Sequence, residues 1–175
     1  MSFEISRYTT EDEIPDIVGD QIAAFFAGNY PPEHEPSARE RDLQRRKDGA
    51  AVLELLNRGR TIYTATTEGW LVGLLESGIY EDGIDPETTE GAVELLCWLM
   101  TEQDLRGQGI ASAVHAAFIA DAMTRTRERR PKRTDVLLGV NEKNPAKNVY
   151  EHWGYREQGR PEGAPDIILM SKPLQ

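Results

Sequence analysis

The sequence predicts an α+β fold in which helices flank one layered, mixed sheet. Three observations carry this prediction: two strands of alternating apolar residues at 61–80, a nearly continuous apolar run at 92–101 and an alanine-rich helical stretch at 110–129. The helical stretch lies between the apolar run and a later strand, which makes it a crossover connection of the sheet. The expected order is strand, two helices, three strands, helix, strand, helix and two strands.

The N-terminal third of the chain predicts one strand and two helices. Residues 3–8 alternate as a strand, and a capping box that begins at Thr10 opens a helix that stops at Gly28. A second capping box at Ser37 opens a helix that runs to Leu56. Apolar residues at helical spacing give both helices a face that can be buried.

The later elements follow from changes in the apolar period. Residues 68–69 form a hairpin turn between strands at 61–67 and 70–80. The strand at 92–101 is apolar over its length, with Glu94 as its one charged residue, and is expected to be buried on both faces. The remaining elements are a helix at 110–129, a strand at 136–140, a short helix from Asn144 to Trp153 that Gly154 caps, and two strands that begin at Tyr155 and Asp166.

Composition restricts the class of protein. The chain has 175 residues and a net charge of −10, which suits one domain over 1–175 and argues against a nucleic-acid binder. The longest apolar stretch, 95–100, is too short to cross a bilayer and no signal-peptide pattern is present, so a cytoplasmic protein without membrane contact is expected. One cysteine, Cys97, and three histidines match neither a disulfide nor a zinc site, so no metal is expected. The acidic charge favours a cationic substrate, or serves solubility alone.

Two segments differ from the rest of the chain in charge or in proline content. Residues 125–133 carry six cations and one acid, which predicts a solvated helix end, or a site that attracts a phosphate-bearing ligand. The loop at 29–36 holds three prolines and is predicted to be an exposed acidic flap. His34 in this flap, and His115 and His152 at surface spacing on their helices, are expected to be exposed.

A glycine turn between the apolar strand and the long helix is the most informative motif. It reads Arg-Gly-Gln-Gly over 106–109, and its glycines permit close backbone approach. The unpaired N–H groups and the positive dipole end of the next helix suit a pyrophosphate. The Walker pattern is excluded because Ile110 and Ala111 stand where Lys and Ser or Thr are required. The dinucleotide fingerprint fails because Ser112 stands where Gly or Ala is required.

This turn resembles the signature of the GNAT superfamily of acyl-CoA-dependent N-acetyltransferases, Arg/Gln-x-x-Gly-x-Gly/Ala at a strand-to-helix junction. Arg106, Gly109 and Ala111 fit the signature. Residues 144–155 resemble a second family segment, which begins with Asn and ends in Tyr-Glu-x-x-Gly-Phe. The element order also matches, so the resemblance covers nearly the whole chain, strongly over 92–155 and weakly in the two N-terminal helices.

The resemblance implies a mostly antiparallel sheet in which the strands at 92–101 and 136–140 splay apart and hold acyl-pantetheine between them. The pantetheine amides would pair with the edge of the first of these strands, and the N–H groups of 107–112 would hold the pyrophosphate. The implied acyl donor is acetyl-CoA, and no metal is needed. Asn144 would help to hold the donor, although an Asn before Pro is also an ordinary helix cap. The implied binding residues are Leu99, Met100, Thr101, Arg106, Gly107, Gln108, Gly109, Ile110, Ala111, Ser112 and Asn144.

Acyl transfer requires the acceptor amine to lose a proton and the CoA thiolate to be protonated or stabilised. By resemblance Tyr150 occupies the family's general-acid position, but it also belongs to an apolar helical stripe that would make it a core aromatic. Glu94 is a candidate for the base or for holding a water, because a carboxylate in an apolar strand must be hydrogen-bonded, line a cleft or face solvent. A bulge in the strand would change the face that Glu94 occupies. Glu76 is the reserve candidate, and a water chain without any side-chain base is the third alternative.

The predicted function is transfer of an acetyl group from acetyl-CoA to a primary amine of a small cationic molecule, by direct attack in a ternary complex. Glu33 and Glu35 in the flap would recruit such an amine. One alternative is acetylation of a protein N-terminus or lysine, and another is a non-catalytic acyl-CoA-binding module. The sequence does not identify the acceptor or the length of the acyl group, and it does not decide whether the protein forms a homodimer.

Overall fold

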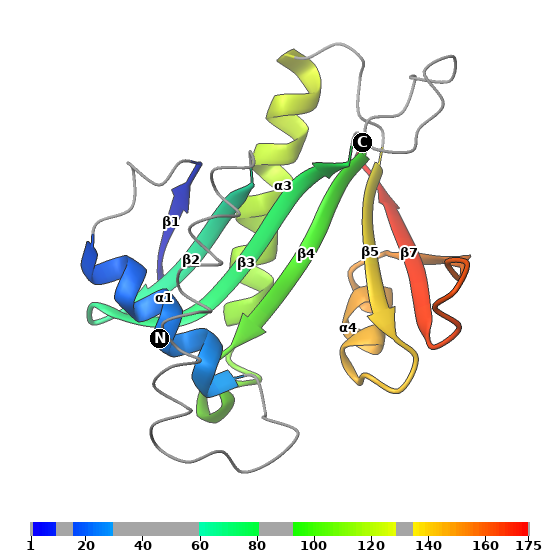
Figure 1. The fold of residues 1–175 in the computed structure, drawn as a ribbon. Coiled ribbons are helices and arrows are strands. Elements are labelled where there is room, and N and C mark those ends of the chain that lie inside the picture. The colour runs from blue at the N-terminus through cyan, green and yellow to red at the C-terminus, as the bar shows by residue number, and fades with distance from the viewer. Residues whose placement is uncertain (1, 10–15, 30–59, 81–92, 129–134, 175) are drawn as a thin grey trace. The chain divides into compact units, whose positions relative to one another are not determined.

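The computed structural model describes residues 2–9, 16–29, 60–80, 93–128 and 135–174. They form a seven-stranded mixed sheet in the order β1-β2-β3-β4-β5-β7-β6, flanked by helices (Figure 1). β4 and β5 are parallel, whereas β1–β2, β2–β3, β5–β7 and β6–β7 are antiparallel. This confirms the predicted α+β class. The elements are β1 (Glu4–Tyr8), α1 (Asp16–Asn29), β2 (Thr61–Thr67), β3 (Trp70–Tyr80), β4 (Val93–Thr101), the 3-10 helix η2 (Gln103–Leu105), α3 (Ile110–Glu128), β5 (Asp135–Asn141), α4 (Ala146–His152), β6 (Arg156–Gly159) and β7 (Ile167–Pro173).

The chain packs into two compact units, and β3, β4 and α3 contribute residues to both. The first unit comprises residues 1–77 and 98–118, and the second comprises residues 78–97 and 119–175. The prediction of one domain over the whole chain stays a prediction. Among the described residues, none of the helices combines the length and the apolar character that crossing a bilayer requires.

In the first unit, α1 and α3 cover opposite faces of the strands. Leu74 of β3 packs in one apolar cluster with Ile22 and Phe25 of α1. The preceding residue, Gly73, points the other way, where a Cβ would lie only 2.5 Å from the Cγ2 of Ile110 on α3. α3 therefore rests directly on the backbone of β3, and glycine at position 73 permits this close approach.

β4 contributes side chains to both units. Glu94 forms an ion pair with Arg125 of α3, whereas Met100 packs against the apolar cluster that includes Ile22 and Phe25 of α1.

The prediction that β4 is buried on both faces was wrong for its C-terminal half. Glu94 and Leu96 are buried, but the residues from Cys97 to Thr101 are half-buried or exposed, and Trp98 is 38% exposed. The parallel pairing with β5 consists of Glu94 with Val136 and Leu95 with Leu137. The apolar run therefore predicted the position of the strand correctly, but it did not predict how much of the strand is buried.

The second unit has a core of strands β5 and β7 and the aromatic residues around α4. The register pairs Leu138 with Met170 and Val140 with Ile168, and all four side chains are buried. Gly154 follows α4 with a φ of +91°, which confirms the predicted glycine cap. Its left-handed conformation allows Tyr155 N–H to donate to the carbonyl of Tyr150 at 3.0 Å.

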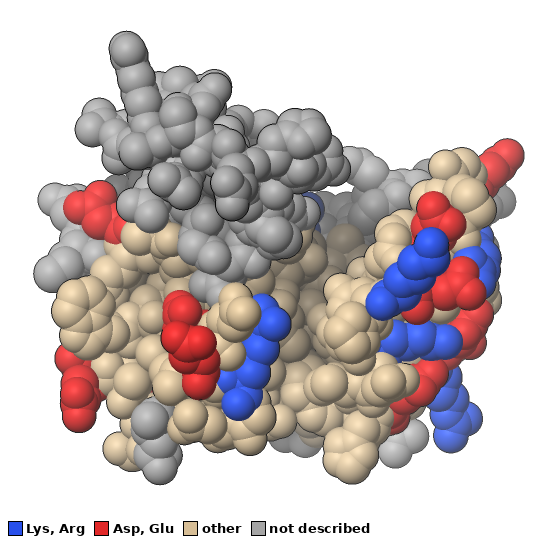
Figure 2. Space-filling view, turned by 90° about the horizontal axis from the view of Figure 1, so that it is seen from below, with Lys and Arg blue, Asp and Glu red and all other residues tan. Residues whose placement is uncertain are grey.

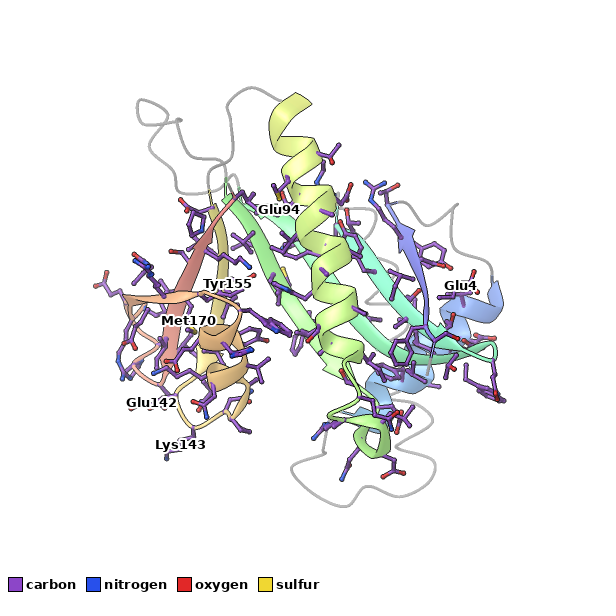
Figure 3. All side chains as sticks on the ribbon, turned by 180° about the vertical axis from the view of Figure 1, so that it is seen from behind. Glu4, Glu94, Glu142, Lys143, Tyr155 and Met170 are labelled. Carbon is purple, nitrogen blue, oxygen red and sulfur yellow. The ribbon has the colours of Figure 1, made fainter. Side chains whose placement is uncertain are left out.

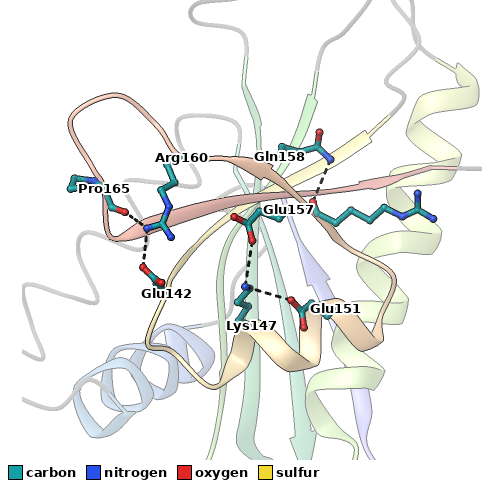
Figure 4. A network of polar contacts seen from close by, with 8 residues as sticks. Glu142, Lys147, Glu151, Glu157, Gln158, Arg160 and Pro165 are labelled. Carbon is teal, nitrogen blue, oxygen red and sulfur yellow. Dashed lines mark hydrogen bonds and ion pairs between the residues drawn. The ribbon is translucent and has the colours of Figure 1, made fainter.

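Charged side chains of both signs alternate on the surface around α4 and the β5–β7 strands (Figure 2). The Nζ of Lys147 on α4 lies 3.6 Å from Oε1 of Glu151 and 3.4 Å from Oε2 of Glu157 on β6. The Nη1 of Arg160 lies 2.9 Å from Oε2 of Glu142 and also donates to the carbonyl of Pro165 (Figure 4). The guanidinium of Arg160, through its hydrogen bond and its charge, lowers the pKa of the Glu142 carboxyl.

Two predictions for α3 were wrong. His115 is only 5% exposed and packs against Phe118, because α3 is buried on more of its circumference than surface spacing indicated. Arg125 belongs to the predicted solvated helix end, but its side chain is 13% exposed and pairs with a carboxylate of β4. Several predictions lie outside the described residues: the helix at 37–56, the flap at 30–36 with Glu33, His34 and Glu35, and the basic residues at 129–133.

Candidate functional site

The predicted phosphate cradle lies between β4 and α3, within the first unit. The chain leaves β4 at Glu102, whose N–H donates to the carbonyl of Val72 on β3 at 3.0 Å. It then forms η2, and Arg106 N–H donates to the carbonyl of Gln103 at 3.3 Å. Gly107 and Gly109 follow with φ of +79° and +85°, a conformation that favours glycine. The connection from β4 to the start of α3 therefore consists of η2 and a turn with two glycines.

The N-terminal turn of α3 is suited to bind an anion. Its first intrahelical hydrogen bond runs from Ala113 N–H to the carbonyl of Gly109 at 2.9 Å, so the N–H groups of residues 110–112 have no acceptor within the helix. Gly109 has no side chain that could cap them, and the first turn holds no acidic residue. Among the described residues, no atom lies within 4 Å of the position that a Cβ would take at Gly107 or Gly109. Donors, dipole and open space therefore fit a diphosphate.

The predicted binding residues of the cradle differ in what they can offer. Arg106, Gly107, Gln108, Gly109 and Ser112 are exposed, and Ala111 is half-buried. The Ile110 side chain is 1% exposed and packs on β3, so only its backbone is available.

The predicted binding residues of β4, Leu99, Met100 and Thr101, are half-buried. The Met100 side chain packs in the apolar cluster on the α1 side, so of this residue only the backbone can serve the predicted strand-like pairing with pantetheine. That pairing stays a prediction.

Asn144 acts as a local cap in the second unit. Its Oδ1 accepts a hydrogen bond from Ala146 N–H at 2.9 Å, and its carbonyl accepts one from Lys147 N–H at 3.1 Å. This is the capping role that an Asn before Pro predicts. The side chain is exposed, and its contact with an acyl donor stays a prediction.

Tyr150 lies in an aromatic cluster at the C-terminal end of α4. Its ring meets those of Trp153 and Tyr155 edge to face, with centroids 5.9 Å and 5.8 Å away. The side chain is 8% exposed, and burial raises its pKa to about 12. The phenol therefore keeps its proton throughout the physiological range and can act as a hydrogen-bond donor. The predicted apolar stripe of α4 is only partly buried, since Val149 is 42% exposed.

We expect the two buried tyrosines to make the protein sensitive to alkali. Burial raises the pKa of both Tyr150 and Tyr155 above the usual 10, so above pH 10 the unfolded chain releases protons that the folded chain keeps. The free energy of unfolding should then fall as pH rises from 10 to 12. For Tyr150 the loss at pH 12 is about 2 kcal/mol. Urea denaturation of wild type and Tyr150→Phe at pH 8 and 12 measures it, and equal pH dependence in both would contradict the expected role of Tyr150.

Glu94 is held by an ion pair within the second unit. The carboxylate is 2% exposed and accepts a hydrogen bond from Arg125, whose other guanidinium nitrogen donates to Asp121 one turn earlier on α3. Figure 3 shows Glu94 on β4 beside α3. A carboxylate in an apolar strand was expected to have a hydrogen-bond partner, and sequence reasoning missed that Arg125 is this partner. The signal was present, because the end of the helix that follows β4 carries several arginines.

Glu76 is a second buried carboxylate, on β3 of the first unit. It is 3% exposed, and its Oε1 lies 3.9 Å from the Nε of Arg60. Burial raises its pKa, and the charge of Arg60 offsets this in part. Glu76 lies opposite Ile62 in the β2–β3 register, so both side chains point to the α1 side of the strands.

Comparison with solved structures identifies the fold. An aminoglycoside 6'-N-acetyltransferase complexed with coenzyme A has a TM-score of 0.68 and 17% identity, covering 98% of this chain and 97% of that one. PaiA N-acetyltransferase from Thermoplasma acidophilum, also complexed with coenzyme A, has a TM-score of 0.62 and 14% identity over 99% of both chains. The ribosomal-protein-S18-alanine N-acetyltransferase from Escherichia coli has a TM-score of 0.61 and 17% identity, covering 99% of this chain and 95% of that one.

No protein-family model and no curated protein matches the chain. Other solved structures of this fold are described as GNAT-family acetyltransferases, among them one from Staphylococcus aureus with a TM-score of 0.66. The chain has the GNAT acetyltransferase fold, which confirms the fold that the glycine turn and the 144–155 segment predicted.

Proposed function

We propose that the protein is an acyl-CoA-dependent N-acetyltransferase that acetylates a primary amine of a small cationic molecule. The observation that carries the proposal is the start of α3, where free N–H groups, two glycines of positive φ and an acid-free first turn form a diphosphate cradle on a GNAT fold. The acyl donor supplies an activated thioester. This chain's residues then have to bind the diphosphate, accept a proton from the amine and stabilise the leaving thiolate.

Tyr150 is the proposed donor to the thiolate. Its burial supports this role, because a phenol with a pKa near 12 does not ionise at working pH and presents its O–H continuously. An ordinary thiol has a pKa of about 8.5, so the phenol acts by hydrogen bonding to developing negative charge rather than by titrating itself.

For the proton acceptor, the geometry favours Glu76 over Glu94. Oε1 of Glu94 already accepts a hydrogen bond from the guanidinium of Arg125 and is thereby engaged in an ion pair. Glu76 has a raised pKa, the shift by which a carboxylate becomes a better base near neutral pH. We therefore propose Glu76 as base and Glu94 as the residue that positions β4, with a base role for Glu94 and a water chain as the alternatives.

The proposal that the acceptor is a small cationic molecule rests on the net charge of the chain. The chain carries −10 overall, so it attracts cations from solution. Solved structures of this fold include two aminoglycoside 6'-acetyltransferases. The fold also includes a ribosomal-protein-S18-alanine N-acetyltransferase, so peptides belong in any acceptor screen.

The test is thermal melting with acetyl-CoA, with NAD as control. Acetyl-CoA at about 100 times its Kd should raise the melting temperature by roughly 5 to 11 °C, and NAD should not. In Ser112→Glu the acetyl-CoA affinity should fall roughly 10- to 100-fold, because the added carboxylate faces the diphosphate. The same carboxylate interacts favourably with the helix dipole, so the variant should melt no lower than wild type without ligand.

Ala116→Glu is the matched control, because this exposed residue lies one turn further along α3. Its acetyl-CoA affinity should stay close to that of wild type. A melting temperature unmoved by acetyl-CoA, or equal affinities in Ser112→Glu and Ala116→Glu, would refute the cradle. Release of CoA with small polyamines but not with peptides then establishes the acceptor class. Release of CoA with peptides alone favours a protein acetyltransferase. Binding of acetyl-CoA without release of CoA contradicts the catalytic proposal.

A further inference from the structure

Trp98 is a large aromatic residue of β4 to which the proposed reaction assigns no role. Its side chain is 38% exposed, although β4 is an interior strand of the sheet, with β3 and β5 as neighbours. A single exposed aromatic residue is common on protein surfaces, so the residues beside Trp98 decide what its ring can bind.

Two observations fix how β3 and β4 lie side by side. The N–H of Glu102, just after the end of β4, donates to the carbonyl of Val72 on β3 at 3.0 Å. Two residues further along each strand, Leu74 and Met100 pack in the same apolar cluster on the α1 side. The two strands therefore run antiparallel, as their arrows in Figure 1 show, and Leu74 lies beside Met100.

The next pair of this register is Glu76 with Trp98. Side chains two residues apart on a strand share a face, so Glu76 and Trp98 lie on the α1 side, as Leu74 and Met100 do. Residues opposite each other on neighbouring antiparallel strands have Cβ atoms about 5 Å apart, which brings their side chains into contact distance. Both residues belong to the first unit. An exposed indole therefore lies beside the proposed proton acceptor.

The carboxylate of Glu76 keeps lone pairs for a ligand. Its Oε1 lies 3.9 Å from the Nε of Arg60, which is longer than a hydrogen bond, so this ion pair leaves the carboxylate able to accept from another N–H donor. The charge of Arg60 also offsets part of the attraction that Glu76 exerts on a cation. A neighbouring indole face adds an attraction for a cation that the carboxylate does not supply.

We propose that Trp98 determines the specificity of the acceptor site: its indole contacts the ammonium group of the acceptor by a cation–π interaction while Glu76 accepts a hydrogen bond from the same group. Indole is the strongest aromatic partner of an ammonium ion, and a carboxylate forms a charge-assisted hydrogen bond with it. The ligand class is an alkyl diamine or polyamine. This inference deepens the proposed function and rests on it for the role of Glu76.

The first test measures binding without acyl donor, so it does not depend on turnover. Protein labelled with 5-fluorotryptophan gives ¹⁹F signals for Trp70, Trp98 and Trp153, which single Trp→Leu variants assign. At constant ionic strength, 1,4-diaminobutane should shift the signal of Trp98. Trp70 is 71% exposed at the β2–β3 hairpin, and its signal should stay. The neutral control 1,4-butanediol should move neither signal.

The second test uses variants of the two exposed tryptophans. Trp98→Leu should weaken the binding of 1,4-diaminobutane roughly 3- to 30-fold, measured by calorimetry, because it removes the cation–π contact. Trp98→Phe keeps an aromatic ring of weaker attraction and should lie between Trp98→Leu and wild type. Trp70→Leu is the matched control and should bind like wild type. In turnover the loss should appear in KM for the diamine, with kcat and the effect of acetyl-CoA on melting unchanged.

Three results would each overturn the proposal: equal affinity of Trp98→Leu and wild type for the diamine, an equal loss in Trp70→Leu, or a Trp98 signal that butanediol shifts as far as the diamine does. Failure of the proposed function gives a different result. Diamine binding that depends on Trp98, without release of CoA from acetyl-CoA, would support the cation site and refute the transfer reaction.

Discussion

Replacing Tyr150 by Phe should lower kcat roughly 100- to 10,000-fold, with little change in the melting temperature or in the affinity for acetyl-CoA. The ring packs edge to face against Trp153 and Tyr155, and Phe keeps both contacts. Only the hydroxyl is lost, and with it the hydrogen bond that we propose for the leaving thiolate. The effect should appear in kcat rather than in KM, because the interaction forms only as negative charge develops.

Tyr155→Phe provides the control, because this residue lies in the same aromatic cluster and is also buried. Any effect of a missing hydroxyl on packing should appear in both variants, whereas the loss of turnover should appear in Tyr150→Phe alone. Steady-state kinetics of CoA release, with melting curves of both proteins, make the comparison. Unchanged turnover in Tyr150→Phe would make Tyr150 a core aromatic and nothing more.

Replacing Arg125 by Met should lower the free energy of unfolding by about 3 to 5 kcal/mol, which corresponds to a drop of roughly 6 to 20 °C in melting temperature. The variant removes the guanidinium that binds Glu94, a carboxylate only 2% exposed on β4. A buried carboxylate that loses a guanidinium loses the part of the compensation for leaving water that this guanidinium provides. Urea denaturation at neutral pH measures the effect.

Two further variants separate this explanation from a general loss of packing. In Arg125→Met combined with Glu94→Leu both charges are absent, so much of the lost stability should return. Arg160→Met breaks the exposed pair with Glu142 and should change the free energy of unfolding by at most about 1 kcal/mol. A double variant as unstable as Arg125→Met would contradict the buried ion pair as the source of the effect.

Elements with a local signature were predictable from the sequence. The hairpin around 68–69 needs two residues of positive φ, and Glu68 and Gly69 have φ of +52° and +81°. The glycine turn before α3 and the cap at Gly154 also depend on neighbours in sequence, and each lies where it was predicted. Capping, turn and periodicity rules act over a few residues, so they can be applied without knowledge of the tertiary structure.

Features that depend on distant residues were not predictable in the same way. The partner of Glu94 lies 31 positions away on another element, and the pattern of charges at that helix end favoured solvent. The contact of Met100 with the apolar cluster of α1 likewise depends on another element of the fold. The raised pKa values of Glu76 and Tyr150 result from burial, which depends on the packing of several elements.

The close approach of α3 to β3 links Gly73 of β3 to Ile110, whose backbone N–H belongs to the proposed cradle. A side chain at position 73 would lie 2.5 Å from Ile110, the first residue of the helix whose N-terminal turn forms the cradle. Any enlargement at 73 must push that helix end away from the strand or be matched by a smaller residue at 110. A glycine on β3 therefore helps to set the position of the helix end that we propose to hold the diphosphate.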